Sequence, residues 1–521
     1  MLSLLFASAA FALPEISISK RDAHMQKSLM ARGVYKRDSS VETNVYNIAP
    51  WSAGGAYYAN VTVGTPPQDQ VVILDTGSSD LYFDASTASS CSGGERGSCR
   101  GGTFDHSKSN SYKVVAQSPA FNTSFGDGTT AYGPFGEDVV GIGDLRIKNV
   151  QFGLAETVNS TTGYAVGLMG VGYGFNEATD HSYPNIPEVL TLSGAINSRL
   201  YSVYLNDDDS TGSILFGGID KSKYTGDLVT INLLPDARTG TVFQFITTVT
   251  DLSATVGGKT SSLFSGGTNT IQAYGNDDQS LPVLLDTGSA AWELPSSYYS
   301  RLFKPAFPYI RKDFTCPCSV RNRDDSVTLT IGGAVKITVK ARDFITPYYD
   351  PETNQAVPDT VDSGDTLCLS MIQPGQSLGT GFMVLGDAIL RSMYVVFDLD
   401  QGQVSIAQAK LNSTDKPNIV EVPSGPGGVA KAASAKQPSS SQTWSIEPAV
   451  QDQTASFSAS TAQSTIGTAT GTAAVPADAQ ISGEASSSGS GSSASAERID
   501  WIVFSVSALV GVFVLGGVGS L

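Results

Sequence analysis

The sequence predicts an all-β fold built from two related lobes, and three observations lead to this prediction. Short runs rich in Val, Ile, Thr, Tyr and Phe alternate with Gly, Asn, Asp and Ser breaks from about residue 53 to residue 411. The 521 residues exceed one ordinary hydrophobic core, so at least two packed units are expected. An apolar run that ends in Asp-Thr-Gly-Ser occurs at residues 71–78 and again at 282–289.

The repeat extends beyond these four residues. Two apolar residues and a glycine follow each copy, in GLMGVG at 167–172 and in MVLGDAIL at 383–390. A single Asp-Thr-Gly-Ser would be an ordinary turn, because Asp and Gly are common turn residues. Two copies with the same downstream element indicate a duplication, with a first lobe at 54–225 and a second at 226–411. Helical periodicity is weak, and short helices are expected only at 186–195 and 296–303.

The beginning of the chain has the features of a secreted precursor. Residues 1–12 form a short apolar run that ends in Ala-Phe-Ala, which is typical of a signal peptide, although Lys and Arg are missing from its start. A buried N-terminal helix is the alternative. Residues 13–37 are basic and contain two Lys-Arg pairs, which resemble dibasic processing sites. Such a pro-segment could cover a carboxylate-lined site until its removal, and an unstructured spacer is the alternative.

The end of the chain predicts a membrane tether. Residues 423–497 are dominated by Ser, Thr, Ala, Gly and Gln, which indicates a disordered and O-glycosylated stalk. The segment 498–521 ends in an uncharged apolar tail after a polar spacer, as in a GPI-attachment signal. The candidate attachment residues are Gly489, Ser490, Gly491 and Ser492. A transmembrane anchor is the alternative, and either anchor would hold the protein at the plasma membrane or the cell wall.

Charge and histidine content exclude several classes of protein. A formal net charge of −17 argues against nucleic acid as a partner and fits a protein that works in acid. No histidine forms a spaced pair with another ligand type, so we expect no metal site, and the chain lacks an obvious base for a serine or cysteine nucleophile. We interpret the following acids and histidines as solvated surface residues: His106, His181, Glu293, Asp207, Asp208 and Asp209.

Cysteines and sequons agree with a secretory route. Cys91 and Cys99 flank a Gly-rich loop and are expected to form a disulfide. Cys368 is expected to pair with Cys318 or with Cys316, which leaves one cysteine over. Four sequons predict N-glycosylation at Asn60, Asn122, Asn159 and Asn412.

The two repeated aspartates are the candidate catalytic groups. If the lobes face each other, Asp75 and Asp286 meet at the seam and share one proton, because two adjacent carboxyls cannot both ionise. The ionised carboxyl can deprotonate a water that attacks a peptide carbonyl, while the neutral one stabilises the tetrahedral intermediate. This chemistry needs no cofactor, no metal and no covalent intermediate.

The neighbouring residues suit this arrangement. Gly77 and Gly288 permit tight turns with backbone N–H groups aimed at the carboxylates. We expect Thr76 and Thr287 to form hydrogen bonds across the seam. Hydroxyl groups for the outer carboxylate oxygens would come from Ser78 and Ser289. Gly170 and Gly386 would let the downstream strand pass behind each loop.

With these motifs, residues of about 54–411 resemble the pepsin-like aspartic proteases, and the stalk and anchor signal resemble those of the fungal, GPI-anchored yapsin branch. The resemblance implies a bilobal fold with the active-site cleft between the lobes, Asp75 and Asp286 as the catalytic pair, and peptide substrates. The hairpin at 124–140 is similar to the flap that closes over substrate, and Gly126 and Gly128 suit a mobile tip.

The flap departs from the family pattern. Phe125 stands where the family has a tyrosine, and Tyr82 stands where many relatives have the tryptophan that accompanies it. Tyr132 is an alternative flap aromatic whose spacing fits less well. Asp127 at the flap tip could favour a basic substrate side chain, as expected for yapsin-like cleavage after Lys or Arg, or it could be an ordinary turn residue.

The favoured hypothesis is a monomeric aspartic endopeptidase at the cell surface that cleaves basic sites at acidic pH. A catalytically inactive binding protein with the same fold would usually have lost an Asp or Gly of one motif, and both motifs are whole. A structural wall protein would lack the two convergent acids.

Overall fold

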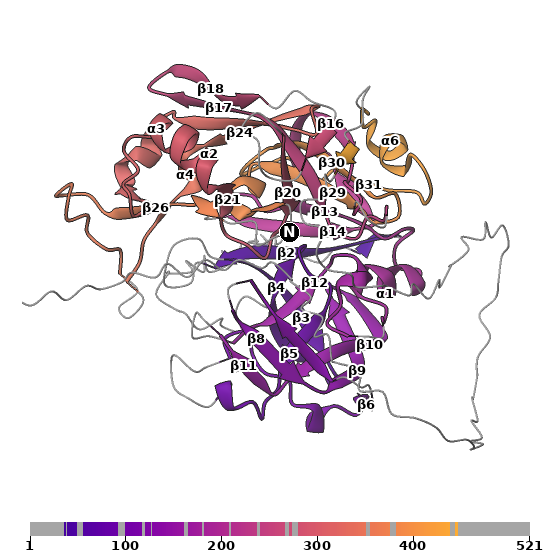
Figure 1. The fold of residues 1–521 in the computed structure, drawn as a ribbon. Helices are drawn as coiled ribbons and strands as arrows, with labels where there is room; N and C mark the ends of the chain where they lie inside the picture. Colours follow the sequence, from indigo (N-terminus) through magenta and orange to yellow (C-terminus); the bar gives the residue numbers. More distant parts are fainter. Residues whose placement is uncertain are drawn as a thin grey trace, which may run out of the picture. The chain divides into compact units, whose positions relative to one another are not determined.

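Four strands surround each Asp-Thr-Gly-Ser motif, and their order in the sheet is the same in both halves of the chain. In this computed structural model, the motif strand pairs antiparallel with the strand before it and parallel with the later apolar-apolar-Gly strand. The first set is β3 (Ala56–Val63), β4 (Gln68–Asp75), β5 (Leu81–Asp84) and β12 (Gly167–Gly170). The second set is β17 (Ile246–Val256), β20 (Leu281–Leu285), β21 (Trp292–Pro295) and β28 (Met383–Leu385). Figure 1 labels all of these strands except β28. The prediction of a bilobal all-β fold is confirmed.

The structure describes most of both lobes, and all of these residues belong to one compact unit. The described ranges are 36–37, 39–48, 56–91, 99–116, 120–126, 128–160, 165–179, 182–207, 210–236, 240–265, 270–272, 280–350, 355–375, 382–437 and 443–445. The predicted signal peptide, most of the pro-segment, Asp127, Asp208, Asp209, His181, the candidate attachment residues and the apolar tail lie outside the described residues.

Further strands extend each set. The first lobe adds β6 (Lys113–Val115), β9 (Phe135–Ile142) and β10 (Leu145–Ala155), and a separate sheet of β7 (Phe121–Ser124), β8 (Thr130–Gly133) and β11 (Thr157–Asn159). The second lobe adds β18 (Lys259–Ser265), β23 (Ser326–Ile331), β24 (Val335–Lys340) and β27 (Ile372–Gly375), and a sheet of β22 (Thr315–Pro317), β25 (Ile345–Pro347) and β26 (Leu367–Ser370). Two further short strands, β19 (Thr270–Gln272) and β32 (Thr443–Ser445), pair with each other.

Strands from both sides of the expected lobe boundary at 225/226 form one shared sheet. Its strands run in the order β16-β30-β29-β13-β14-β2 and continue into β3 of the first lobe. They are β2 (Ser40–Ile48), β13 (Leu200–Tyr204), β14 (Thr211–Phe216), β16 (Tyr224–Asn232), β29 (Met393–Asp398) and β30 (Gln403–Ala409). The β2 strand also pairs with β1 (Lys36–Arg37), the second Lys-Arg pair of the pro-segment. Tyr201 and Phe397 stack across this sheet with ring centroids 5.1 Å apart, so the two halves share one core.

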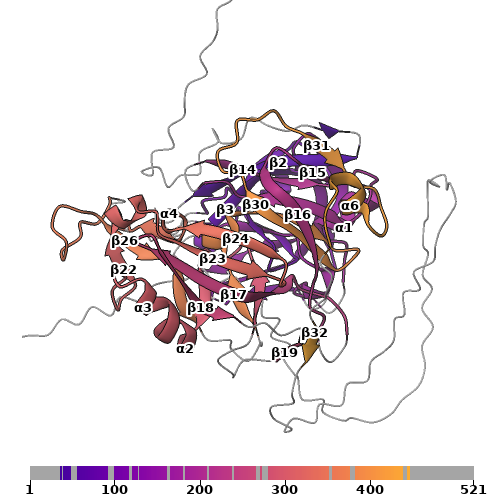
Figure 2. The same ribbon diagram turned by 90° about the horizontal axis from the view of Figure 1, so that it is seen from above.

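The folded part also extends beyond residue 411, which corrects the expected start of the stalk at 423. β31 (Ile419–Glu421) pairs with β15 (Gly218–Asp220), and the helix α6 (Gly428–Ala433) follows it (Figure 2). Val429 is 4% exposed because it packs into an apolar cluster with Tyr394. Backbone hydrogen bonds join Lys436 to Leu228 and Thr230. The Ser/Thr-rich composition of this segment gave no indication that its first residues pack against the second half of the protein.

Helices are short, as the weak helical periodicity predicts. The expected helix at 186–195 is α1 (Ile186–Leu192), where the Asn185 side chain accepts a hydrogen bond from the Glu188 N–H. The expected helix at 296–303 is α2 (Ser296–Tyr298), continued by a short π-helix (Tyr299–Phe303). Besides α6, the other α-helices among the described residues are α3 (Lys304–Ala306), α4 (Ala341–Phe344) and α5 (Asp387–Leu390). Within the described ranges, no helix has the length and apolar character needed to cross a membrane.

Candidate active site

Each candidate aspartate lies at the end of a buried apolar strand. Asp75 ends β4, and Asp286 follows β20 directly; both are 0% exposed. The downstream glycines lie close behind the two loops. A Cβ on Gly170 would be 2.5 Å from the Ser79 nitrogen, and one on Gly386 would be 2.3 Å from the Ser289 carbonyl oxygen. Only glycine fits at these two crossings, as expected from the repeated apolar-apolar-Gly element.

Thr76 and Thr287 connect the two loops by a symmetric exchange of hydrogen bonds. The Thr76 N–H donates to Thr287 Oγ1 at 3.1 Å, and the Thr287 N–H donates to Thr76 Oγ1 at 3.0 Å. Each hydroxyl then donates to a carbonyl of the other lobe, Thr76 to Leu285 and Thr287 to Leu74, both at 2.8 Å. All four bonds are buried, so they hold the ends of β4 and β20 in a fixed relation.

The carboxyl groups of Asp75 and Asp286 meet at this seam. Each Oδ1 accepts a hydrogen bond from the glycine N–H two residues later, at 2.7 Å from Gly77 and 2.8 Å from Gly288. A Cβ on Gly77 would lie only 2.7 Å from the Asp286 carboxyl carbon, so the carboxyl of one lobe rests against the loop of the other. Ser78 donates its hydroxyl to Asp75 Oδ2, whereas the Ser289 hydroxyl donates to the Ala291 carbonyl at 3.4 Å.

Burial and the neighbouring carboxyl raise the pKa of Asp286 far above its ordinary value. Burial is the largest cause, and the charge of Asp75 and a hydrogen bond with it add to the effect. Asp286 therefore keeps its proton under conditions in which an exposed aspartate is ionised. The site can hold a neutral acid and a carboxylate side by side, which is what acid–base attack by a water requires.

A third buried acid, Asp387, lies behind the pair. Its N–H donates to the Ser289 carbonyl at 2.8 Å, and its side chain is 0% exposed. Burial raises its pKa well above the ordinary value; Arg391, four residues later, lowers it, and the charge of Asp75 raises it further. Sequence reasoning used the preceding Gly386 and overlooked Asp387, although it follows that glycine directly in MVLGDAIL.

A buried acidic network beside Asp75 was also missed. Tyr183 donates its hydroxyl to Asp80 Oδ1 at 2.6 Å, and the Ala178 N–H donates to Asp80 Oδ2 at 2.7 Å. Glu177 accepts from the Tyr183 N–H at 2.9 Å. Burial raises the pKa of Asp80 to about 6 and that of Glu177 to about 9. Asp80 directly follows the first Asp-Thr-Gly-Ser-Ser, but its partners lie a hundred residues away, and no local pattern indicates them.

The expected flap is the hairpin of β7 and β8. The Phe125 N–H donates to the Thr129 carbonyl at 2.8 Å, and Gly128 has a φ of 87°, which glycine adopts readily. The Phe125 and Tyr82 rings lie with centroids 6.3 Å apart, so the two aromatic positions contact each other. Tyr132 is 52% exposed, which does not favour it as the flap aromatic.

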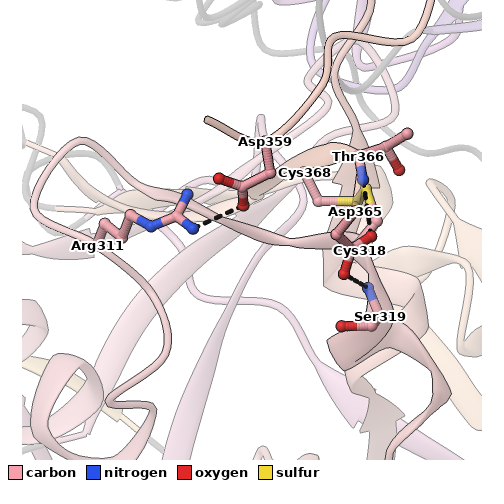
Figure 3. Close-up of a disulfide and its surroundings, with 7 residues drawn as sticks. All are labelled: Arg311, Cys318, Ser319, Asp359, Asp365, Thr366 and Cys368. Carbon is pink, nitrogen blue, oxygen red and sulfur yellow. Dashed lines mark hydrogen bonds and ion pairs between the residues drawn. A yellow bond between two sulfur atoms is a disulfide. The ribbon is translucent and has the colours of Figure 1, made fainter. Parts of the chain in front are cut away.

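The structure contains two disulfides, Cys91–Cys99 and Cys318–Cys368. Figure 3 shows the second of them. Cys316 is a buried free thiol, although it lies directly opposite Cys368 in the β22–β26 pair. Among the sequons, Asn122, Asn159 and Asn412 are exposed, whereas Asn60 is half-buried. Asn412 donates its side-chain amide to Asp207 at 3.0 Å.

Three residues that we interpreted as solvated surface are not. Asp207 is 6% exposed and pairs with Arg342 at 2.8 Å. His106 is half-buried beside Tyr112, with ring centroids 5.1 Å apart. Glu293 is half-buried next to Gly375. For Asp207 and Glu293 the neighbour lies far away in the sequence, so the polar local context was misleading.

Two buried aspartates shared between twin β lobes define an aspartic-type endopeptidase, and the comparison with known proteins agrees. The family model "Eukaryotic aspartyl protease" matches residues 56–409, and the chain belongs to this family. It is 33% identical over 386 residues to the "Probable aspartic-type endopeptidase OPSB" of Arthroderma benhamiae, which covers 72% of this chain and 73% of that protein. It is 32% identical over 409 residues to the "Aspartic proteinase yapsin-3" of Saccharomyces cerevisiae, covering 75% and 72% of the two chains. The "Acid protease" of Saccharomycopsis fibuligera is 33% identical over 367 residues, covering 68% and 81%.

We expect Thr287→Val to lower the free energy of unfolding by about 3 kcal/mol, because it leaves the Thr76 N–H and the Leu74 carbonyl buried and unpaired. Thr338→Val is the matched control, since Thr338 is exposed and its hydroxyl forms an exposed hydrogen bond with the Thr328 hydroxyl of the neighbouring strand, and it should change stability by less than about 0.5 kcal/mol. Urea denaturation of the two variants and the parent measures the difference. Equal effects of the two substitutions would contradict the role of the threonine exchange.

Stability should fall as the pH rises from about 4 to 7. Burial raises the pKa of Asp84 to about 7, as it also raises those of Asp80, Glu177 and Asp286, so the folded chain binds more protons than the unfolded chain in this range. Each such group lowers the free energy of unfolding by up to about 1.4 kcal/mol per pH unit.

The measurement is the thermal unfolding temperature at several pH values. Asp84→Asn resembles the neutral form of Asp84, so the unfolding temperature of this variant should fall less between pH 4 and 7 than that of the parent. Asp69→Asn, at an exposed position of β4, should show the same fall as the parent. A stability that rises between pH 4 and 7 would contradict this assignment of neutral buried acids.

Proposed function

We propose that Asp75 and Asp286 are the catalytic pair of this endopeptidase and that they activate a water between them. The observation that carries this proposal is the close approach of the Asp286 carboxyl to the Gly77 loop together with its raised pKa. Asp75 acts as the base that takes a proton from the water, and Asp286 donates its proton toward the substrate carbonyl oxygen. Thr76, Gly77, Ser78, Thr287, Gly288 and Ser289 orient the pair, and the hairpin at 124–140 covers the substrate.

We further propose that the enzyme works in acid, prefers peptide bonds next to Lys or Arg, and is held at the cell surface by a GPI anchor. The raised pKa of Asp286 agrees with acidic conditions, because acid keeps the proton on the carboxyl that acts as the general acid. The net charge of −17 and the similarity to a protein named yapsin-3 support basic substrates. The stalk and apolar tail support the anchor, and nothing in the sequence calls for a cofactor.

Asp75→Asn and Asp286→Asn should each lower kcat/KM on a Lys-containing peptide at pH 4 by at least about a thousandfold. Each variant has an amide in place of one carboxyl, so the pair no longer contains both a base and an acid. Asp69→Asn is the matched control: it makes the same chemical change on the same strand, at an exposed position. A statine-containing peptide should inhibit the parent and protect it against thermal unfolding. If Asp75→Asn cleaves as well as the parent, the assignment of the pair is wrong; if the folded parent binds the statine peptide and cleaves nothing, the protein is a binding protein.

The full chain, expressed in a fungal cell, should be released from intact cells by a phosphatidylinositol-specific phospholipase C, because a GPI anchor is linked to the membrane through a phosphoinositide lipid. A chain that ends at residue 447 should appear in the medium without this treatment. Retention that only detergent relieves would instead indicate a transmembrane anchor.

A further inference from the structure

The internal repeat gives each residue near Asp75 a counterpart near Asp286. Seven residues after each aspartate lie Tyr82 on β5 and Glu293 on β21. The strand register confirms that they correspond. Leu81 pairs with Met169, the residue before Gly170, and Trp292 pairs with Leu385, the residue before Gly386. Glu293 therefore occupies in the second lobe the place that Tyr82 has in the first.

In the first lobe this place faces the flap. The Tyr82 ring lies 5.6 Å from Phe121 and 6.3 Å from Phe125, measured between ring centroids. A peptide held under the hairpin would pass next to this face of β5. Because side chains alternate along a strand, β21 directs Trp292 and Leu294 into the core and Glu293 to the other face. The second lobe thus presents a carboxyl where the first presents an aromatic ring.

Glu293 is held in place but has no counter-charge. A Cβ on Gly375 would lie 2.6 Å from the Glu293 Cβ and 2.7 Å from its Oε2, so the glycine makes room for this side chain. Met383, on the adjacent strand β28, closes the same space, with its methyl group 2.7 Å from that Cβ position. Across the part of the chain that the structure describes, the Glu293 carboxyl has neither a hydrogen bond nor an ion pair.

An acid in this position is poorly satisfied by the protein alone. Burial raises the pKa of Glu293, which shows that its surroundings disfavour the charged form. A half-buried carboxylate is strongly stabilised by a cation that approaches from outside. The carboxylate has already lost part of its hydration on folding, and its attraction to the cation is screened less than at the surface. A substrate side chain that enters between the lobes can supply this cation, and its charge favours the ionised form of Glu293 and so opposes the effect of burial on the pKa.

We propose that Glu293 is a specificity-determining residue that binds the ammonium or guanidinium group of a Lys or Arg side chain of the peptide substrate. This inference rests on the proposed function. It assigns part of the preference for basic substrates to one side chain of the second lobe, at a fixed distance along the substrate from the bond that is cut.

The test uses the full chain and peptides in which a single Lys moves through the positions around the cleaved bond, each paired with a peptide that has norleucine at the same position. The readout is the ratio of kcat/KM for the Lys peptide to that for the norleucine peptide. Glu293→Gln should lower this ratio about tenfold at one position, and Glu293→Lys should make a Glu-containing peptide the better substrate there. Glu137→Gln is the matched control, because Glu137 lies on β9 in a surface ion pair with Lys113 of β6. The substitution removes the same charge and should leave the ratio unchanged.

The outcomes separate the two proposals. If the parent fails to cleave, or if Asp286→Asn cleaves, the proposed function is wrong. The assignment of Glu293 is wrong if the parent cleaves but Glu293→Gln keeps the Lys-to-norleucine ratio at every position. It is also wrong if kcat/KM falls equally for both peptides, so that the ratio is unchanged. In both cases the assignment of the catalytic pair stands. Thermal unfolding of Glu293→Gln and Glu293→Lys checks that both variants are folded.

Discussion

The mutual hydrogen bonding of Thr76 and Thr287 is the constraint on which the rest of the site depends. Each threonine uses its N–H and its hydroxyl to bind the opposite lobe, so neither loop can move without breaking bonds that have no replacement in the buried seam. The aspartates precede these threonines directly and take their positions from them. Two carboxyls that would repel each other in water are thereby kept in contact, and the raised pKa of Asp286 follows from that enforced proximity.

Buried acids are a general feature of the surroundings of this pair. The pKa values of three buried acids are raised: Asp80, Glu177 and Asp387. Of the three, Asp387 is the one whose pKa is lowered in part by a basic side chain, that of Arg391. In acid these groups are neutral, so their burial costs little beyond the loss of hydrogen bonds to water. A protein that folds and works in acid can therefore use carboxyls as hydrogen-bonding groups where a neutral-pH protein would use amides or hydroxyls.

Sequence reasoning reached the parts of this structure that local chemistry dictates. The two Asp-Thr-Gly turns, the threonine bonds and the glycines behind them follow from what each residue type can do, and the repeat doubled the signal. The Asp80–Tyr183–Glu177 network, the half-buried Glu293 and the packed α6 depend on contacts between distant segments, which leave no local pattern. The shared sheet was missed for the same reason: β13 and β29 read as ordinary strands of separate lobes, and only their pairing joins them.

Because of that shared sheet, the protein can become active only when its synthesis is nearly complete. β29 and β30 come from the last part of the folded chain, yet they pair with β13 and β16 from its middle. A nascent chain that has both aspartates but has not yet released Asp387 and residues 393–409 from the ribosome cannot close the sheet or support the second loop from behind. The protease is thus assembled only when nearly all of its body has left the ribosome, which limits the damage that a half-made enzyme could do to its neighbours.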